Sequence, residues 1–252
     1  MSDRGLGAAR GVSDVIGFVF VFSLVVSSVA IVSVVGFGGL QDSRDAARTE
    51  NTELAFDVLA NNIEDIRLRN VPARATEIRL AGGGLTTGNE TVVRVTVGTR
   101  TTNRTIEPIV YESDDTRIVY ETTAVLREET GPGGSGASFV REPELALPDD
   151  GTPNRTAIPL VDTDMPPGRT GGETTALIRT AATDRSVIND TADATVTLEI
   201  ETTEPRAAAW DRYLDGELAG SDPCARGGGT VNCTFDTSRV VVSSTRIDVS
   251  YE

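Results

Sequence analysis

Residues 15–41 read VIGFVFVFSLVVSSVAIVSVVGFGGLQ, a run of 27 residues without a charged side chain. About 20 apolar residues are enough for a helix to cross the hydrocarbon core of a bilayer, about 30 Å thick. In water the many β-branched and aromatic residues would favour a strand. In lipid the backbone must satisfy its own hydrogen bonds, which favours a helix. The sequence therefore predicts one membrane-spanning helix over residues 12–40.

A second helical segment is expected directly after the span. Residues 36–39 read Gly-Phe-Gly-Gly, and each Gly costs about 1 kcal/mol relative to Ala inside a helix. We therefore expect a kink or a melted turn there. Residues 41–70 are expected to form an amphipathic stalk helix that ends before Pro72. Its apolar stripe, at helical spacing, consists of Ala55, Leu59, Ile63 and Ile66.

The remainder, residues 71–252, is expected to be a β-rich domain. Runs that alternate apolar and polar residues, bounded by Gly, Asn, Asp and Pro, indicate strands, and short connections indicate antiparallel pairing. These runs are residues 76–80, 91–98, 116–121, 124–127, 174–180, 194–202, 230–235 and 245–251. One short helix is expected over residues 205–214. Residues 131–172, rich in Gly and Pro, are expected to be loops around two brief apolar pieces.

These elements together predict the fold class. It is α+β, with a long N-terminal helix, membrane-spanning and then amphipathic, packed on an antiparallel β-sandwich or a wrapped β-sheet.

Composition restricts the environment and the partners. The chain has 38 acidic and 23 basic residues, a net charge of −15 and no His. Every basic residue is Arg. At molar salt the Debye length falls to about 3 Å, so surface carboxylates repel each other little and keep the protein hydrated. The composition resembles that of halophilic archaeal proteins. The large negative charge argues against nucleic acid as a partner.

The sequence offers no constellation of residues for catalysis, a cofactor or a metal. It lacks His, the commonest general base, and it lacks a Gly-x-Ser-x-Gly, P-loop or dinucleotide-binding motif. Asp149-Asp150 and Asp162-Thr163-Asp164 are oxygen ligands that a hard cation would accept. However, no twelve-residue calcium loop is present, and adjacent carboxylates are expected among so many acids. We therefore predict that the protein is not an enzyme and has no metal site.

The two cysteines, Cys224 and Cys233, leave two alternatives open. They can close a ten-residue disulfide loop, which suits an exported domain. They can equally be two unpaired thiols. Two Cys without His provide too few soft ligands for zinc.

A short head precedes the apolar run, and its residues 10–17 read Arg-Gly-Val-Ser-Asp-Val-Ile-Gly. A secretory signal peptide has an apolar core of about 7–15 residues and a small-residue cleavage site after it. Here the run is longer, and no Ala-x-Ala pattern closes it. The head resembles instead the class III signal peptides of type IV pilins and archaellins. In haloarchaeal pilins Val-Ser-Pro-Val-Ile-Gly is typical, and this chain departs from that pattern at Asp14.

The resemblance implies a processing site and a candidate assembly residue. A prepilin peptidase would remove residues 1–11 by cutting between Gly11 and Val12, directly after Arg10. Asp14 would then be the third mature residue, placed to pair with the new amine of Val12 on a neighbouring subunit. The alternative is that Asp14, or Ser13, caps the membrane helix.

The alternative for the whole head is an ordinary signal anchor. Charge bias does not separate the two interpretations, because two arginines lie before the span, Arg4 and Arg10, and two lie just after it, Arg44 and Arg48.

Five Asn-x-Thr triplets are candidate glycosylation sites, and all lie beyond the apolar run. They begin at Asn89, Asn103, Asn154, Asn189 and Asn232. Five of the nine Asn residues in such triplets is more than the abundance of Thr suggests. Glycosylation would place residues 71–252 outside the cell.

The sequence thus predicts a type IV pilin-like surface protein, anchored in the cell membrane by a single span. Its expected role is that of a structural or adhesive subunit of a surface filament. The expected partners are membrane lipid, the prepilin peptidase and other pilin-like subunits that contact the N-terminal helix. The alternative is a non-polymerising, single-pass anchored envelope or binding domain.

Overall fold

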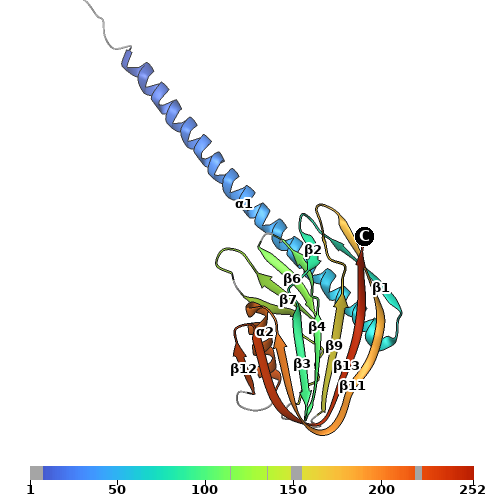
Figure 1. The fold of residues 1–252 in the computed structure, drawn as a ribbon. Coiled ribbons are helices and arrows are strands. Elements are labelled where there is room, and N and C mark those ends of the chain that lie inside the picture. The colour runs from blue at the N-terminus through green and yellow to red at the C-terminus, as the bar shows by residue number, and fades with distance from the viewer. Residues whose placement is uncertain (1–7, 114, 135, 149–154, 219–222) are drawn as a thin grey trace, which may run out of the picture. The chain divides into compact units, whose positions relative to one another are not determined.

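The computed structural model describes residues 8–113, 115–134, 136–148, 155–218 and 223–252 (Figure 1). The chain divides into two compact units, Met1–Arg48 and Thr49–Glu252. Helix α1, Ala8–Arg69, contributes its first part to one unit and its second part to the other. We describe each unit by itself.

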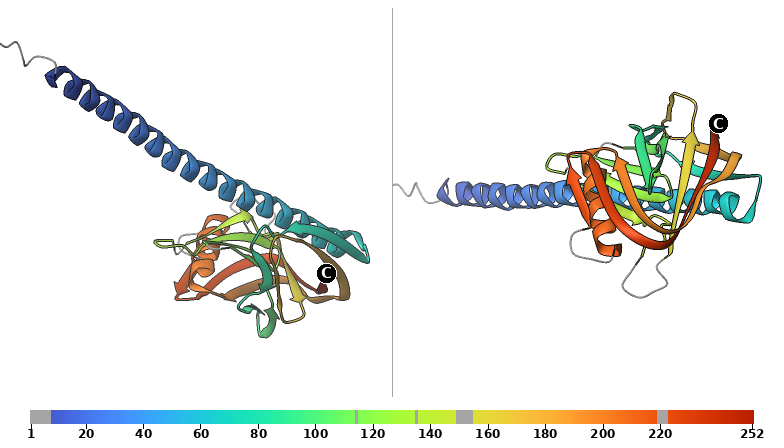
Figure 2. Two further views of the ribbon diagram at one scale, coloured as in Figure 1. Left: turned by 90° about the horizontal axis from the view of Figure 1, so that it is seen from above. Right: turned by 60° about the horizontal axis from the view of Figure 1, so that its bottom comes forward.

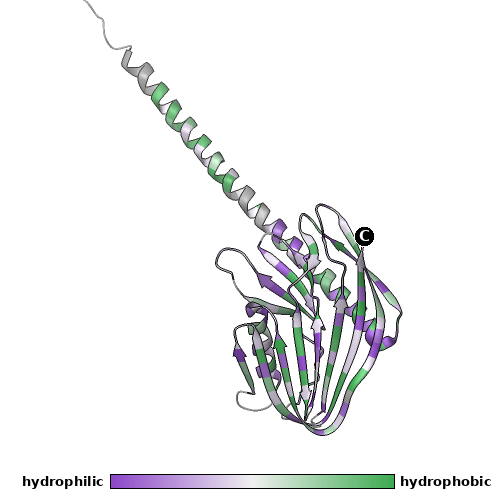
Figure 3. Ribbon diagram, in the orientation of Figure 1, coloured by the Kyte–Doolittle hydropathy of each residue, from purple (hydrophilic) through white to green (hydrophobic). Residues whose placement is uncertain are grey.

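The first unit is the N-terminal part of α1. Residues 36–39 are helical and belong to α1. The prediction of a melted turn at these residues is therefore wrong. Each Gly costs only about 1 kcal/mol, whereas unpaired backbone groups in an apolar medium cost several kcal/mol each. The segment Val15–Val34 has a mean hydropathy of 2.8, and none of it is buried within the chain. This segment is the green, hydrophobic stretch of α1 in Figure 3.

The second unit contains two β-sheets, the rest of α1 and helix α2, Glu204–Glu217. The seven-stranded sheet, called sheet A, contains β1 (Ala73–Arg79), β3 (Thr91–Val97), β4 (Arg100–Ile106), β9 (Arg155–Asp164), β11 (Thr175–Glu201), β12 (Cys224–Gly227) and β13 (Thr230–Tyr251). The six-stranded sheet, called sheet B, contains β2 (Gly84–Thr87), β5 (Ile109–Glu112), β6 (Thr116–Glu121), β7 (Ala124–Glu129), β8 (Ala137–Arg141) and β10 (Arg169–Gly171). Every ladder is antiparallel except the one between β9 and β13.

Two unusually long strands form the frame of sheet A. β11 has 27 residues and β13 has 22, and they pair along nearly their whole lengths. Figures 1 and 2 show the two strands curving together. The register shifts twice on β11, between Ala182 and Asp184 and between Val187 and Asn189, and such bulges bend and twist a strand. We expected two separate strands on each of these stretches, but each stretch is one continuous strand.

The curvature gives sheet A two arms. β3 and β12 pair with one end of the β11–β13 ribbon, and β1 and β9 pair with the other end. Sheet A is therefore a curled half-barrel, which agrees with the predicted wrapped sheet. The α+β fold class predicted from the sequence is confirmed.

Sheet B has buried side chains on both of its faces. On β6, Ile118 and Tyr120 belong to the hydrophobic cluster around α1, whereas Val119 belongs to the cluster around α2. On β7, Val125 and Leu126 divide in the same way. Successive side chains of a strand point to opposite faces. Sheet B therefore lies between the two clusters of the core.

The buried stripe of α1 differs from the prediction at one position. Leu59, Ile63 and Ile66 are buried as expected, but Ala55 is only partly buried. Phe56 is buried next to it, together with Ala60 and Thr52. Positions 52, 56, 59, 63 and 66 follow the spacing of three and four that one face of a helix requires. Just after the helix, Asn70 has a positive φ of 56°, as is common at a helix C-terminus.

Residues 131–172 differ most from the secondary structure that we predicted. They contain β8, β10 and all of β9, rather than loops around brief apolar pieces. β9 pairs with β13 in parallel over ten residues. Pro159 interrupts the strand signal in the sequence, but an edge strand tolerates Pro because one side of its backbone makes no ladder bonds. The short strands β2, β4, β5 and β12 were also not predicted from the sequence. The helix expected over 205–214 is present as α2.

Candidate functional site

The apolar segment of α1 is the most prominent candidate for a functional surface. Its large side chains are exposed all round the helix, up to 71% for Phe20 and 75% for Val34. A helix that is apolar on every side is buried in a lipid bilayer or among other helices. The segment is long and apolar enough for a single membrane span or signal anchor. It contains no charged side chain, so its chemistry is that of packing.

The predicted processing residues lie at the start of this helix. Arg10, Gly11 and Val12 have helical backbone, and α1 begins at Ala8. Asp14 is therefore inside the helix of the uncut chain and not at its N-cap position. The side chains of these four residues are outside the described part of the structure. The pairing proposed for Asp14 therefore stays a prediction.

Ion pairs attach the second part of α1 to sheet B. Arg141 on β8 donates to Asp57 at 3.1 Å, to Asn61 at 2.7 Å and to Glu64 at 2.8 Å, all on α1. It also reaches Glu144, three residues further along the chain, at 3.1 Å. One arginine thus connects nearly two turns of the helix to the sheet.

Two further pairs extend this connection along the helix. Arg67 of α1 pairs with Glu144, and Glu53 of α1 accepts from Arg127 of β7 at 3.1 Å. Burial raises the pKa of Glu144 above the usual value of a glutamate, while the nearby Arg67 acts in the opposite direction. Together with the buried stripe, these contacts fix the second part of α1 to the domain.

A buried charged cluster, which the sequence did not indicate, joins α2 to both sheets. Glu121 of β6 is fully buried. Its Oε1 accepts from the indole nitrogen of Trp210 at 2.7 Å, and its Oε2 accepts from Thr91 of β3 at 2.6 Å and from Arg206 of α2. Because a buried charge is costly without partners, this cluster holds α2 in one position between the sheets. Sequence separations of 30 to 89 residues hide it from any local pattern.

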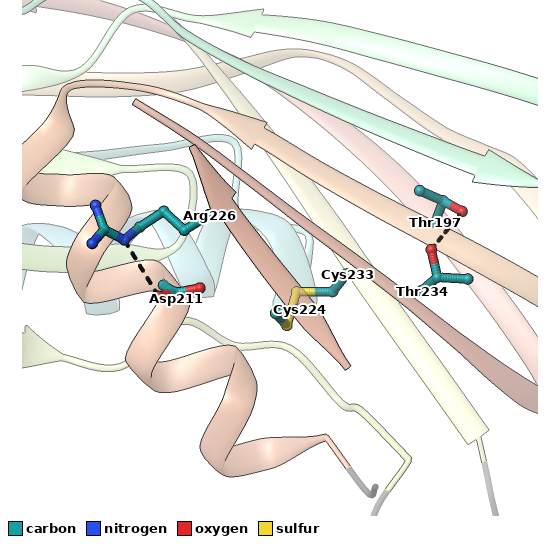
Figure 4. Close-up of a disulfide and its surroundings, with 6 residues drawn as sticks. All are labelled: Thr197, Asp211, Cys224, Arg226, Cys233 and Thr234. Carbon is teal, nitrogen blue, oxygen red and sulfur yellow. Dashed lines mark hydrogen bonds and ion pairs between the residues drawn. A yellow bond between two sulfur atoms is a disulfide. The ribbon is translucent and has the colours of Figure 1, made fainter. Parts of the chain in front are cut away.

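Of the two alternatives for the cysteines, the structure has the disulfide and not two unpaired thiols. Cys224 on β12 and Cys233 on β13 are directly opposite in the ladder, with Cα atoms 4.1 Å apart (Figure 4). An ion pair of 3.4 Å between Arg226 of β12 and Asp211 of α2 lies beside it. The short strand β12 is thus tied to β13 on one side and to α2 on the other.

The candidate glycosylation sites differ in accessibility. Asn89 is exposed in the connection between β2 and β3, and Asn103 is exposed on the edge strand β4. Asn232 is partly buried, lies between two paired strands and donates to Glu199 at 3.3 Å. Asn189 lies at a bulge of β11, but its side chain is not described, and Asn154 lies outside the described residues.

The carboxylates considered for a hard cation are not gathered into one site. Asp162 on β9 accepts from Arg246 at 3.0 Å, so its charge already has a partner. Asp149 and Asp150 lie outside the described residues. Among the residues that the structure describes, no group of three or more acidic, Cys or His residues has a metal-binding arrangement.

Comparisons with known proteins identify relatives but no activity. A protein-family model with the description "Family of unknown function (DUF7289)" matches residues 10–250. A protein of Archaeoglobus fulgidus, printed as "Uncharacterized protein", is 30% identical over 78 residues. The aligned stretch is 31% of this chain and only 26% of that protein. No solved structure gives a significant match.

Proposed function

The chain belongs to the family of unknown function DUF7289, and we propose that it is a type IV pilin-like surface protein anchored in the cell membrane. In this proposal the N-terminal helix spans the membrane and contacts other pilin-like subunits. The β-domain faces the outside of the cell as a structural or adhesive part of a surface filament. The proposal includes no catalytic role.

One observation carries this proposal. The apolar segment Val15–Val34 is unburied within the chain, yet it belongs to the same continuous helix whose later residues form a core face of the β-domain. An apolar helix that the chain does not bury needs lipid or other helices around it. A helix shared between a membrane segment and a folded domain supports an anchored subunit. A leader peptide that is removed entirely would not need to share one helix with the folded domain.

Two features of the β-domain support its placement outside the cell. The Cys224–Cys233 disulfide fits an oxidising environment. Asn89 and Asn103, each in an Asn-x-Thr triplet, are exposed on the domain surface. Both features suit an exported glycoprotein.

The proposed maturation follows from the resemblance of the head to class III signal peptides. A prepilin peptidase cuts between Gly11 and Val12, and Arg10 lies directly before the cut. The new amine of Val12 and the carboxylate of Asp14 then carry opposite charges near the start of the mature helix. Pairing between these two groups on neighbouring subunits would offset their burial among apolar helices.

The N-terminus of the mature protein tests the proposal directly. Mass spectrometry of protein purified from native membranes is expected to show a chain that begins at Val12. Gly11→Leu should abolish the cut, while the matched control Gly7→Leu should leave it intact. A chain that retains Met1 or Ser2 would instead support the second candidate, an anchored envelope or binding domain that does not polymerise. The equal number of arginines on the two sides of the span is compatible with that candidate.

Assembly is a separate question with its own measurement. Cross-linking in native membranes should give ladders of the mature chain, linked through residues of the apolar segment. Asp14→Asn should weaken these ladders without changing the processed N-terminus. If Asp14→Asn assembles as the wild type does, the proposed role of Asp14 is wrong even where processing is correct.

A further inference from the structure

A small cavity lies between sheet B and the start of α2, and it has no part in the proposed anchoring. Its volume is about 210 Å³. Two guanidinium groups and two carboxylates line it, those of Arg117, Arg206, Glu112 and Glu128, so the formal charges of the lining cancel. Ligand pockets for drug-sized molecules are usually larger, about 300–1,000 Å³. The cavity is therefore suited to a ligand with a single small ring.

One residue of the cavity lining, Arg206, has a buried donor that lacks a good partner. Arg206 is only 3% exposed. Its Nη1 donates hydrogen bonds to Glu121 and Thr91. Its Nε lies 3.0 Å from an oxygen of Glu128 and 3.0 Å from the hydroxyl oxygen of Thr203. Among the described residues, Nη2 has one long hydrogen bond, 3.4 Å to the backbone oxygen of Asn89. A guanidinium has five N–H groups, so Arg206 retains donor capacity at Nη2.

A buried acceptor lies beside this donor. Glu128 is 6% exposed, and its contacts with Arg206 and Thr203 both involve Oε1. Its Oε2 has no hydrogen-bond partner among the described residues. Val110 and Val119, both buried, form apolar parts of the same lining. Buried polar atoms are nearly always hydrogen-bonded, so these two atoms indicate a ligand that both donates and accepts.

The charges and hydroxyl groups of the lining restrict the ligand further. An anion would meet the carboxylates of Glu112 and Glu128, and a cation would meet the two guanidinium groups, so neither has a net attraction. A hydroxyl group donates one hydrogen bond and accepts two, which matches the buried donor of Arg206 and the buried acceptor of Glu128. Thr86 and Thr87, both partly exposed, also line the cavity and have hydroxyl groups of their own.

We propose that this cavity binds a small, uncharged, polyhydroxylated molecule of the size of one sugar ring. Arg206 Nη2 donates to one ligand oxygen, and Glu128 Oε2 accepts from a ligand hydroxyl. Glu112 and Arg117, themselves paired at 2.6–2.8 Å and partly exposed, complete the charged part of the lining. The inference does not depend on whether the chain forms filaments.

The test uses the unglycosylated full chain in a detergent without a sugar head group, because a sugar detergent would compete. Glucose, galactose and mannose are titrated separately, and binding is followed by calorimetry and by tryptophan fluorescence. Trp210 is the only tryptophan and shares Glu121 with Arg206, so its emission should respond. Saturable binding at millimolar concentration is expected for at least one sugar. A trisaccharide that ends in the same ring shows whether the ligand is a free sugar or the end of a glycan.

Variants distinguish this cavity from binding elsewhere. Thr87→Val removes one hydroxyl at nearly constant shape, and Arg117→Gln removes one positive charge of the lining. Each should weaken binding about fivefold to tenfold, which corresponds to the loss of about one hydrogen bond. The matched control Thr105→Val, an exposed threonine on β4 outside the cavity, should bind as the wild type does.

Three results would overturn the proposal. The first is the absence of saturation with all three sugars, and the second is equal affinity in the wild type and both cavity variants. The third is tighter binding of inorganic phosphate or of glycine betaine than of any sugar. None of these results would affect the proposed anchoring, which is tested by the mature N-terminus.

Discussion

Glu121 and Trp210 are 89 residues apart in the sequence, and the indole nitrogen of Trp210 donates to the Glu121 carboxylate at 2.7 Å with both side chains buried. This bond connects the end of β6 in sheet B to α2. The other oxygen of Glu121 accepts hydrogen bonds from Thr91, Thr202 and Arg206. Four donors therefore surround the buried carboxylate of Glu121, and Trp210 is the one that bonds Oε1.

Trp210→Phe tests this relationship. The substitution keeps most of the aromatic packing but removes the N–H, which leaves Glu121 Oε1 without its donor. A buried acceptor left unsatisfied costs about 1–3 kcal/mol. The smaller ring also leaves a cavity at this buried position, so we expect a loss of stability of at least that size. The measurement is denaturant unfolding followed by circular dichroism, because the variant has no tryptophan.

Tyr213→Phe is the matched control for this prediction. Its hydroxyl donates to the Pro143 backbone oxygen at 3.3 Å from a partly exposed position, where water can replace the lost bond. A clearly smaller loss of stability is expected. If the two variants lose equal stability, the buried bond between Trp210 and Glu121 contributes no more to the free energy of unfolding than a partly exposed bond does.

Reduction of the Cys224–Cys233 disulfide should destabilise the β-domain without abolishing its fold. In the chain-entropy model, a crosslink that closes a loop of about ten residues contributes about 2–3 kcal/mol. Cys224→Ser/Cys233→Ser should therefore lower the free energy of unfolding by about that amount. Reductant should have the same effect on the wild type and no further effect on the double variant. A double variant as stable as the oxidised wild type would contradict the prediction.

The sequence predicted the type of most elements but not their extent, and β11 shows why. Its two ends alternate in burial and were predicted as separate strands, while most described residues of 182–195 have exposed side chains. Those residues pair with β13 on one side, whereas β1 ends before them and β3 begins after them. A strand segment with no buried face has no alternation of apolar and polar residues, so periodicity cannot reveal it.

The buried cluster escaped prediction for a different reason. In a chain with 38 acidic residues, composition predicts that any single carboxylate is solvated. Most acidic side chains among the described residues are indeed not buried. Glu121 is an exception only because Thr91, Arg206 and Trp210 come together around it from distant parts of the chain. By contrast, the apolar span and the stripe of α1 are local patterns, and these were predictable from the sequence.

Leu59→Ala should destabilise the attachment of α1 to the domain. Leu59 is fully buried in the cluster between the helix and sheet B. Truncation of a buried leucine to alanine typically costs about 2–5 kcal/mol. Val58→Ala, at the neighbouring position with 51% of its side chain exposed, should change stability by no more than about 0.5 kcal/mol. Urea unfolding of the full chain in detergent, followed by Trp210 fluorescence, measures both variants. Equal effects would show that the helix packs through a different face.

Glu144 should give the protein a pH dependence of defined sign. Burial raises the pKa of Glu144 in the folded state above the usual glutamate value of 4.5. Between that value and the raised pKa, the folded state binds more protons at this site than the unfolded state does. The contribution of Glu144 to stability therefore increases as the pH falls through this window, and decreases as the pH rises through it.

Glu144→Gln has no such proton equilibrium. The wild type should accordingly gain stability relative to Glu144→Gln as the pH is lowered toward 4.5, measured by urea unfolding at constant salt. Glu173→Gln, at an exposed position, is the control and should follow the wild type in parallel. If the wild type instead loses stability relative to Glu144→Gln over this window, then attraction to Arg67 and Arg141 outweighs burial, and the pKa of Glu144 is lowered rather than raised.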